Sequence, residues 1–227
     1  MRQHLIIDAD DTLWENNVYF ERAFDDFTTF LAHSTLSVEQ IAEIFDEIER
    51  TNARLHGYGS AIFGRSLREC YERLAERDIR GDDLRTVLGF AERLLEQPMD
   101  IIDGVPETLA YLAGRHELTL FTKGHPDEQR IKIDRSGLVE HFAHVAIVRE
   151  KNAPSYRLLV DSRGMLPEQS WMIGNSPRSD VNPALEAGLN AVFVPHSRTW
   201  RLENEELRNG PGRLLVLERF ADLRAHF

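Results

Sequence analysis

Residues 4–13 read HLIIDADDTL, a short apolar stretch that ends abruptly in a run of carboxyl and hydroxyl side chains. A near-continuous apolar run such as His4–Ile7 is typical of a strand buried on both faces of a parallel sheet. Five further runs of this kind predict strands at residues 118–121, 145–148, 171–173, 191–194 and, as an edge strand, 214–217.

Helical patterns separate these predicted strands. They lie at residues 105–113, 127–136, 156–163 and 182–187, and a last helix is expected from Glu218. Alternation of short strands and helices indicates right-handed crossovers and a doubly wound α/β layer. We therefore expect a Rossmann-like core with a parallel sheet.

The segment from Val18 to Glu96 interrupts the alternation, because it reads as helix after helix without a strand. Four amphipathic helices are expected at residues 18–31, 38–55, 66–77 and 82–95. Ser37 and Gln40 form a capping-box pattern, and Asp82 is expected to be an N-cap. The prediction is an α/β core at residues 1–14 and 100–227, with an inserted helical cap domain at residues 15–99.

Composition narrows the classes of function. The 227 residues carry 27 Lys and Arg against 38 Asp and Glu, a net charge of −11, which disfavours binding to a nucleic-acid polymer. The single cysteine, Cys70, has no intramolecular disulfide partner and is expected in a helical core. No stretch approaches the ~20 apolar residues of a membrane span, so we expect a cytoplasmic protein without membrane contact.

Polar residues follow four of the predicted strands. They are Asp8 to Thr12, then Thr122-Lys123-Gly124, then Lys151, and finally Gly174-Asn175 with Asp180. Ligands of open parallel sheets bind at the carboxyl ends of the strands, so we expect these four segments to meet.

The residue types at this edge suit phosphoryl transfer with a metal ion. The Asp8 carboxylate and the Asp10 backbone carbonyl can face one Mg²⁺ ion, to which Asp180 adds an oxygen. Thr122, with the amides near Lys123 and Gly124, suits anionic oxygens, and Lys151 adds positive charge. Positioning and charge neutralisation carry most of such catalysis.

These four motifs, in this order, resemble those of the haloacid dehalogenase-like hydrolases over the whole chain. The resemblance implies that Asp8 is the nucleophile that forms an aspartyl-phosphate. It implies that Asp10 protonates the leaving oxygen and later accepts a proton from water. Thr122 and Lys151 complete the catalytic set, and the metal ligands would be Asp8, Asp10, Asn175 and Asp180.

The acid at position 10 favours a phosphatase over a dehalogenase, because a halide leaves without a proton. We expect a Mg²⁺-dependent hydrolase of small phosphomonoesters. Two alternatives are a phosphomutase with the same intermediate and a catalytically idle protein that binds a phosphorylated ligand. Asn175 stands where many relatives have aspartate and is a weaker Mg²⁺ ligand, and Asp11 stands where glycine is frequent.

Substrate contacts are expected from Thr12, Lys123 and Gly124 in the core. In the cap, the glycine-rich break at residues 55–60 places His56 and Tyr58 in a turn, with Arg65 soon after. These three are either part of a helix–helix connection or contacts to the leaving group of a small phosphorylated metabolite.

Other positions stay open at this level. Trp14, Asn16 and Asn17 lie at the entrance to the cap, where burial is an equal alternative for Trp14. The residues after the fifth strand contribute either to substrate contact or to packing: His196, Arg198, Thr199 and Trp200. The oligomeric state is not encoded in any of these patterns.

Overall fold

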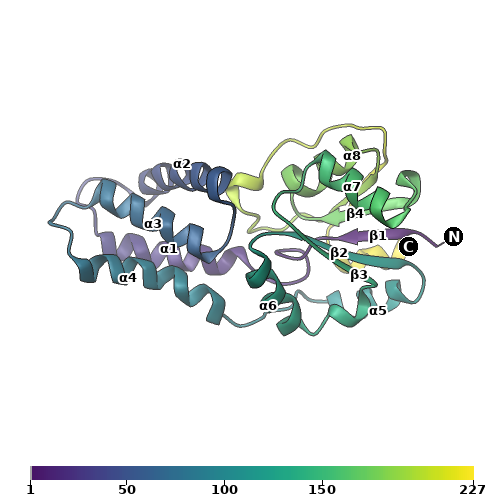
Figure 1. Cartoon of the computed structure of the whole chain (residues 1–227), viewed down its shortest axis with the longest axis horizontal. Helices are drawn as coiled ribbons and strands as arrows, with labels where there is room; N and C mark the ends of the chain where they lie inside the picture. Colours follow the sequence, from purple (N-terminus) through teal and green to yellow (C-terminus); the bar gives the residue numbers. More distant parts are fainter. Residues whose placement is uncertain (1) are drawn as a thin grey trace. The chain divides into compact units, whose positions relative to one another are not determined.

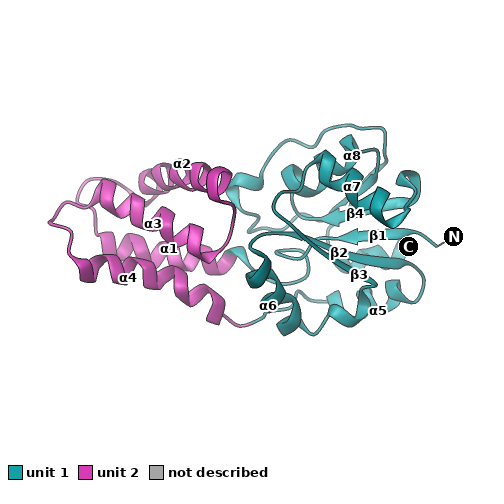
Figure 2. Ribbon diagram, in the orientation of Figure 1, with its two compact units in different colours: residues 1–17, 99–227 teal, residues 18–98 magenta. Residues whose placement is uncertain are grey.

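The computed structural model describes residues 2–227, which form two compact units. The first contains the chain up to Asn17 and Met99–Phe227, and the second is Val18–Pro98 (Figure 2). The expected core ended at residue 14, but residues 15–17 are bonded to the first unit. The backbone of Glu15 donates to Asp100, and those of Asn16 and Asn17 donate to Asp11.

The first unit is built on a six-stranded sheet in which all pairs are parallel, with the strand order β3-β2-β1-β4-β5-β6. Strands β1 to β4 are labelled in Figure 1. The strands are β1 (His4–Ile7), β2 (Glu117–Lys123), β3 (His144–Val148), β4 (Ser170–Gly174), β5 (Asn190–Phe193) and β6 (Leu214–Val216). The strand order reverses direction between β1 and β4. Ligands of open parallel sheets bind at the carboxyl ends of the strands beside such a switch point, and the predicted Rossmann-like fold is confirmed.

Side chains of β1 alternate between the two faces of the sheet. Leu5 and Ile7 belong to one apolar cluster with residues of α5 and α6, whereas Ile6 belongs to another with residues of α7 and α8. Both faces are therefore covered, which explains the continuous apolar sequence of the strand. The four helices are α5 (Val105–Ala113), α6 (Pro126–Ser136), α7 (Ala153–Arg163) and α8 (Asn182–Glu186).

The second unit consists of α1 (Asn17–Leu31, whose first residue belongs to the first unit), α2 (Val38–His56), α3 (Ser60–Leu74) and α4 (Gly81–Glu92), followed by the 3-10 turn Arg93–Glu96. It has its own apolar core, which includes Phe27, Phe45, Leu67 and Cys70. The predicted capping box of Ser37 and Gln40 is present.

Several predicted helix limits were wrong, and three of the differences concern a helix start. Helix α3 begins at Ser60 instead of residue 66 and therefore includes Gly64. A Cβ at Gly64 would lie 2.9 Å from the Cβ of Ala91, so this glycine permits close packing of α3 on α4 and does not break the helix. Helix α4 begins at Gly81, so Asp82 lies inside its first turn. The helix expected from Glu218 is the 3-10 segment Phe220–Ala225.

The described residues contain no helix that is long and apolar enough to cross a membrane.

Candidate active site

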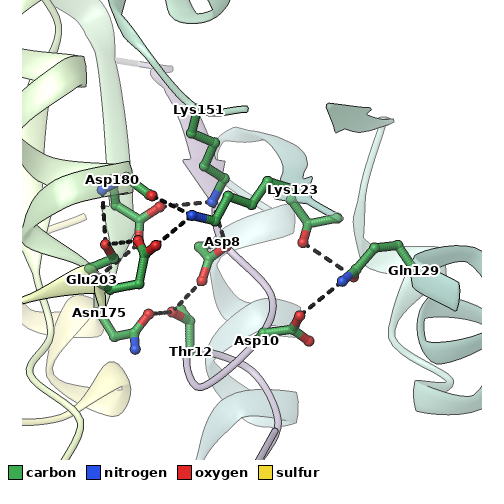
Figure 3. Close-up of polar contacts among 12 residues, drawn as sticks. Asp8, Asp10, Thr12, Lys123, Gln129, Lys151, Asn175, Asp180 and Glu203 are labelled. Carbon is green, nitrogen blue, oxygen red and sulfur yellow. Dashed lines mark hydrogen bonds and ion pairs between the residues drawn. The ribbon is translucent and has the colours of Figure 1, made fainter. Parts of the chain in front are cut away.

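Asp8 lies directly after β1 at the switch point of the sheet and is 7% exposed. Its Oδ1 accepts a hydrogen bond from Nζ of Lys151, and its Oδ2 accepts one from Oγ1 of Thr12 at 3.0 Å (Figure 3). The same Lys151 ammonium donates to Oδ1 of Asp180 at 2.7 Å. Residues from three segments thus meet around one buried ammonium group, as the sequence predicted.

The charges at this centre are unbalanced, because two buried carboxylates share one lysine. Burial alone would lower the pKa of Lys151, but Asp180 and Asp8 raise it above its ordinary value. Burial and the charge of Asp8 raise the pKa of Asp180, although Lys151 acts in the opposite direction. Additional positive charge would stabilise both carboxylates in their ionised form.

Glycine is required immediately before this loop. A Cβ at Gly174 would overlap the carboxylate of Asp180, whose Oδ2 accepts a hydrogen bond from the backbone of Ser176 at 3.0 Å. Asp180 lies in the turn Pro177–Val181, which continues into α8. The backbone of this loop therefore packs directly against the carboxylate that it positions.

Asn175 is oriented by two hydroxyl groups. Its Nδ2 donates to Oγ1 of Thr199 at 2.9 Å, and its Oδ1 accepts from Oγ1 of Thr12 at 3.3 Å. The amide oxygen is thereby turned toward the residue that also contacts Asp8. Carboxylate oxygens of Asp8 and Asp180 with this amide oxygen are the hard donors that Mg²⁺ prefers, so the residues present fit the ion.

The side chain of Asp10 is surrounded by donors. Both of its oxygens accept hydrogen bonds from Nζ of Lys132 at 2.6 Å. Oδ2 also accepts from Nε2 of Gln129 at 2.9 Å, and Oδ1 accepts from the indole of Trp14 at 2.8 Å. Burial raises the pKa of Asp10, but Lys132 and the other donors outweigh it and hold the pKa below its usual value.

Thr122 is the second-last residue of β2 and contacts the same glutamine. Its Oγ1 donates to Oε1 of Gln129 at 3.2 Å, and the backbone N–H of Gly124 donates to the Val148 carbonyl at 3.1 Å. Gly124 has φ of 150°, and a Cβ there would lie 2.7 Å from Nε2 of Gln129. Both groups expected to bind anionic oxygens are thus engaged within the protein.

Lys123 faces the fourth motif. Its Nζ donates to Oγ of Ser179 at 2.8 Å and to Oε1 of Glu203 at 2.5 Å. Oε2 of Glu203 accepts from Oγ of Ser176 at 2.6 Å. Burial raises the pKa of Glu203, whereas Lys123 and the serine hydroxyls hold it below its usual range. This buried network connects the loops after β2, β4 and β5.

The Asp11 side chain accepts hydrogen bonds from the backbone of the segment that follows the first motif. Asp11 has φ of 58°, a left-handed conformation that aspartate tolerates, as expected from its position where glycine is frequent. Its Oδ1 accepts from the backbone N–H groups of Asn16 and Asn17 at 2.8 and 3.0 Å. Trp14 is fully buried, which decides between the two alternatives left open for it.

Asp11, Glu15 and His196 form a second group of potential metal ligands. Nδ1 of His196 accepts a hydrogen bond from the backbone of Arg198 at 3.3 Å, so in the neutral ring the proton is on Nε2. Nε2 lies 3.3 Å from Oε1 of Glu15 and suits a donor there. A protonated nitrogen has no lone pair for a metal, so this geometry fits a hydrogen bond and not a metal site.

The three cap residues belong to the second unit. His56 is the last residue of α2, and Tyr58 lies between Gly57 and Gly59, which both have positive φ. Arg65 lies within α3, where its Nε pairs with Glu69 at 2.9 Å.

Four residues around the predicted site were not assigned to it from the sequence: Gln129, Lys132, Thr199 and Glu203. Gln129 and Lys132 are three residues apart and share a helical face directly after the second motif, which was a usable signal. For Thr199, which follows the fifth strand, the sequence allows either substrate contact or packing. Glu203 had no sequence signal beyond its place in the segment after β5.

Comparison with known proteins agrees with this fold. The model of the haloacid dehalogenase-like hydrolase family matches residues 23–194. A haloacid dehalogenase-like hydrolase from Xanthomonas campestris is 30% identical, covering 99% of this chain and 90% of its own, with a TM-score of 0.86. The chain therefore belongs to the haloacid dehalogenase-like hydrolases.

Two further relatives carry different activities in their names. A phosphoserine phosphatase from Thermus thermophilus is 39% identical over 98 residues, which is 39% of this chain and only 39% of the phosphatase's own length. L-2-haloacid dehalogenase from Xanthobacter autotrophicus has a TM-score of 0.68 at 15% identity, covering 99% of this chain and 98% of its own. At this identity, the similarity between the dehalogenase and this chain is a similarity of fold alone.

Proposed function

We propose that this hydrolase is a Mg²⁺-dependent phosphatase of small phosphomonoesters that acts through a phosphorylated Asp8. The observation that carries the proposal is the convergence of Asp8, Lys151 and Asp180 at the switch point, with a second acid at Asp10. A buried carboxylate beside a fixed ammonium group suits nucleophilic attack on a substrate that brings negative charge.

In the proposed reaction, Asp8, Lys151 and Asp10 each have a separate role. An oxygen of Asp8 attacks phosphorus while Lys151 stabilises the charge on the phosphoryl oxygens. We assign to Asp10 the proton that the departing alkoxide takes up as the bond between phosphorus and oxygen breaks. Because Lys132 and the other donors hold the pKa of Asp10 below its usual value, the Lys132 contact must open before Asp10 can carry that proton. Asp10 then accepts a proton from the water that attacks the aspartyl-phosphate, which releases phosphate and restores Asp8.

The metal would be held by the carboxylates of Asp8 and Asp180, the backbone carbonyl of Asp10 and the amide oxygen of Asn175. When bound, Mg²⁺ supplies positive charge that neutralises the phosphoryl oxygens. The positive charge of the ion would offset the excess negative charge of the centre, where two buried carboxylates share one lysine.

The acid at position 10 distinguishes this proposal from dehalogenation. Halide departure needs no proton, whereas an alkoxide does. Asp10 is held by three donors, which hold in place the side chain that this proposal assigns to proton transfer. In the second unit, we assign the choice of leaving group to His56, Tyr58 and Arg65. In the core we assign substrate contact to Thr12, Lys123 and Gly124, and Thr122 stays in the catalytic set.

Release of phosphate and of halide from one enzyme preparation tests the proposal. A panel of phosphomonoesters and 2-haloacids is supplied with Mg²⁺ or with chelator. We expect phosphate release that requires the metal, no halide release, and no transfer of phosphate to a second substrate hydroxyl, which a mutase would show. Halide release without phosphate release would overturn the proposal.

Asp8→Asn provides the matched variant, because it keeps the size of the side chain and removes the nucleophile. We expect turnover to fall by several orders of magnitude while the circular dichroism spectrum is unchanged. Acid quenching with labelled substrate should trap phosphate on the parent but not on this variant. Near-normal turnover by folded Asp8→Asn would eliminate the covalent mechanism.

A further inference from the structure

Glu203 is a buried carboxylate that the proposed reaction does not use. It is 6% exposed and ends the 3-10 turn Arg201–Glu203, in the segment after β5. Its Oε1 accepts from Nζ of Lys123 (Figure 3), and its Oε2 accepts from Oγ of Ser176. A buried charge is costly unless it is paired and hydrogen-bonded, and these two contacts supply both conditions. One carboxylate therefore joins the second motif to the fourth.

Hydrogen bonds lead from Glu203 to the Asp180 carboxylate through Ser176. The Ser176 hydroxyl donates to Glu203 at 2.6 Å and accepts from the backbone N–H of Ser179 at 2.9 Å. The backbone N–H of Ser176 donates to Oδ2 of Asp180 at 3.0 Å, while Lys151 binds Oδ1 at 2.7 Å. The orientation of the Asp180 carboxylate therefore depends on where the backbone of Ser176 lies, and Glu203 holds the side chain of that residue.

The segment that carries Glu203 is anchored on both sides of it. Before Glu203, Nη1 of Arg178 in the fourth motif donates to the Leu202 carbonyl at 2.9 Å. After it, Nδ2 of Asn182, the first residue of α8, donates to the Glu206 carbonyl at 2.9 Å. The carboxylate of Glu203 thus extends from a fixed backbone, as a residue that orients another must.

We propose that Glu203 is a positioning residue for the metal site, because it holds the loop of the fourth motif in the form that orients Asp180 toward the ion. The inference rests on the proposed Mg²⁺-dependent phosphatase activity. Lys123 supplies the opposite charge, and Ser176 transmits the position of Glu203 to Asp180. Groups that orient a metal ligand in this way typically contribute about 10-fold to 100-fold to metal affinity.

A purely structural role for Glu203 makes a different prediction. Loss of a structural contact lowers the free energy of unfolding, but it leaves the Mg²⁺ dissociation constant unchanged as long as the folded state dominates. Loss of a contact that orients Asp180 weakens Mg²⁺ binding in the folded protein itself. Isothermal titration calorimetry with MgCl₂ measures this dissociation constant without substrate or turnover, and circular dichroism shows that each variant is folded.

The test uses two single variants, their combination and a control. Glu203→Gln keeps the size of the side chain and removes its charge, and Ser176→Ala removes the hydroxyl group that connects Glu203 to the loop. The double variant combines both changes. Glu206→Gln is the matched control, because Glu206 is an exposed carboxylate of the same segment whose backbone contact to Asn182 the substitution retains.

We expect the Mg²⁺ dissociation constant to rise about 10-fold in Glu203→Gln and by a similar factor in Ser176→Ala. Because the two residues act through one hydrogen bond, the double variant should bind Mg²⁺ about as well as either single variant. The Mg²⁺ concentration for half-maximal phosphate release should shift in parallel with the dissociation constant. Glu206→Gln should bind Mg²⁺ like the parent.

An unchanged dissociation constant in folded Glu203→Gln would overturn the inference while leaving the proposed function intact. If Glu203→Gln does not fold, Ser176→Ala decides, and an unchanged constant there would likewise overturn it. Independent, multiplying losses in the double variant would contradict the connection through Ser176. A parent protein that binds no Mg²⁺ would overturn the inference, and one that also hydrolyses no phosphomonoester would overturn the proposed function with it.

Discussion

The side-chain nitrogen of Asn175 donates a hydrogen bond of 2.9 Å to the hydroxyl oxygen of Thr199. This contact determines which end of the amide faces the centre, because the nitrogen is engaged on one side and the oxygen is turned to Thr12 on the other. An amide in the opposite orientation would direct N–H groups at a bound cation. If the proposed Mg²⁺ binds there, Thr199, from the segment after β5, would thus orient the amide oxygen that stands in for a second carboxylate in the fourth motif.

Thr199→Val removes the hydroxyl without changing the volume of the side chain. We expect the Mg²⁺ concentration for half-maximal activity to rise about 3-fold to 10-fold, the loss associated with one neutral hydrogen bond. Asn175→Asp should lower it, because a carboxylate is a stronger Mg²⁺ ligand than an amide. Activation curves at fixed substrate check both, with Thr86→Val on an exposed helical face as control. A Thr199→Val curve that overlies the parent's would remove Thr199 from the metal site.

Gly174→Ala introduces a methyl group where the Asp180 carboxylate lies. Because Asp180 must shift, we expect a free-energy loss of about 1–3 kcal/mol, typical of overpacking, together with weaker activation by Mg²⁺. Thermal unfolding and metal activation curves measure the two effects. Gly114→Ala is the matched control, since that glycine has φ of −69° and ample space. Wild-type stability and metal response in Gly174→Ala would contradict the packing described.

Glu203→Gln should make the pH dependence of stability less steep. Lys123 and the serine hydroxyls hold the pKa of Glu203 below its usual range in the folded protein. A lowered pKa in the folded state contributes stability above the unfolded pKa of about 4.3, and this contribution is lost as pH falls through the folded value. We expect the variant to be about 1–3 kcal/mol less stable at neutral pH.

This difference between parent and Glu203→Gln should begin to shrink as pH falls below the unfolded pKa of about 4.3, and it should vanish only below the lower pKa of the folded state. Urea unfolding at several pH values measures it. A difference that stays constant down to pH 3 would show that the charge of Glu203 does not stabilise the fold.

The reactivity of Cys70 measures unfolding of the second unit alone, because Cys70 lies in that unit. Burial raises the pKa of its thiol to about 12, so the thiolate that reacts with alkylating reagents is scarce in the folded state. All three tryptophans, Trp14, Trp171 and Trp200, lie in the first unit. Labelling of Cys70 and tryptophan fluorescence therefore follow different parts of the chain.

We expect Cys70 to become reactive at a lower urea concentration than the tryptophan transition, because the second unit is the smaller one and has a separate apolar core. Pulse labelling across a urea series, compared with fluorescence, provides the measurement. Coincident midpoints would show that the two units unfold as one.

The local pattern of apolar residues in the sequence was sufficient to predict most of the fold. The runs that predicted β1 and the strands after it are apolar because both faces of the sheet are covered, a condition that marks each strand by itself. Placing Asp8, Lys151 and Asp180 together needed only the rule that ligand-binding residues lie at the carboxyl ends of parallel strands. Helix α3 was mispredicted because Gly64 packs against Ala91, a contact that no local pattern contains.

Contacts between distant side chains required the tertiary structure. The sequence alone determined that Asp8 and Asp10 follow a buried strand, that three other polar segments share its edge of the sheet, and which family they resemble. Only the packing of α6 on that sheet decided that Lys132 and Gln129 reach Asp10, and only the chain's return after β5 brought Thr199 and Glu203 to the fourth motif. Strand periodicity is a local property, whereas a hydrogen bond depends on ångström-scale positions that packing between elements sets.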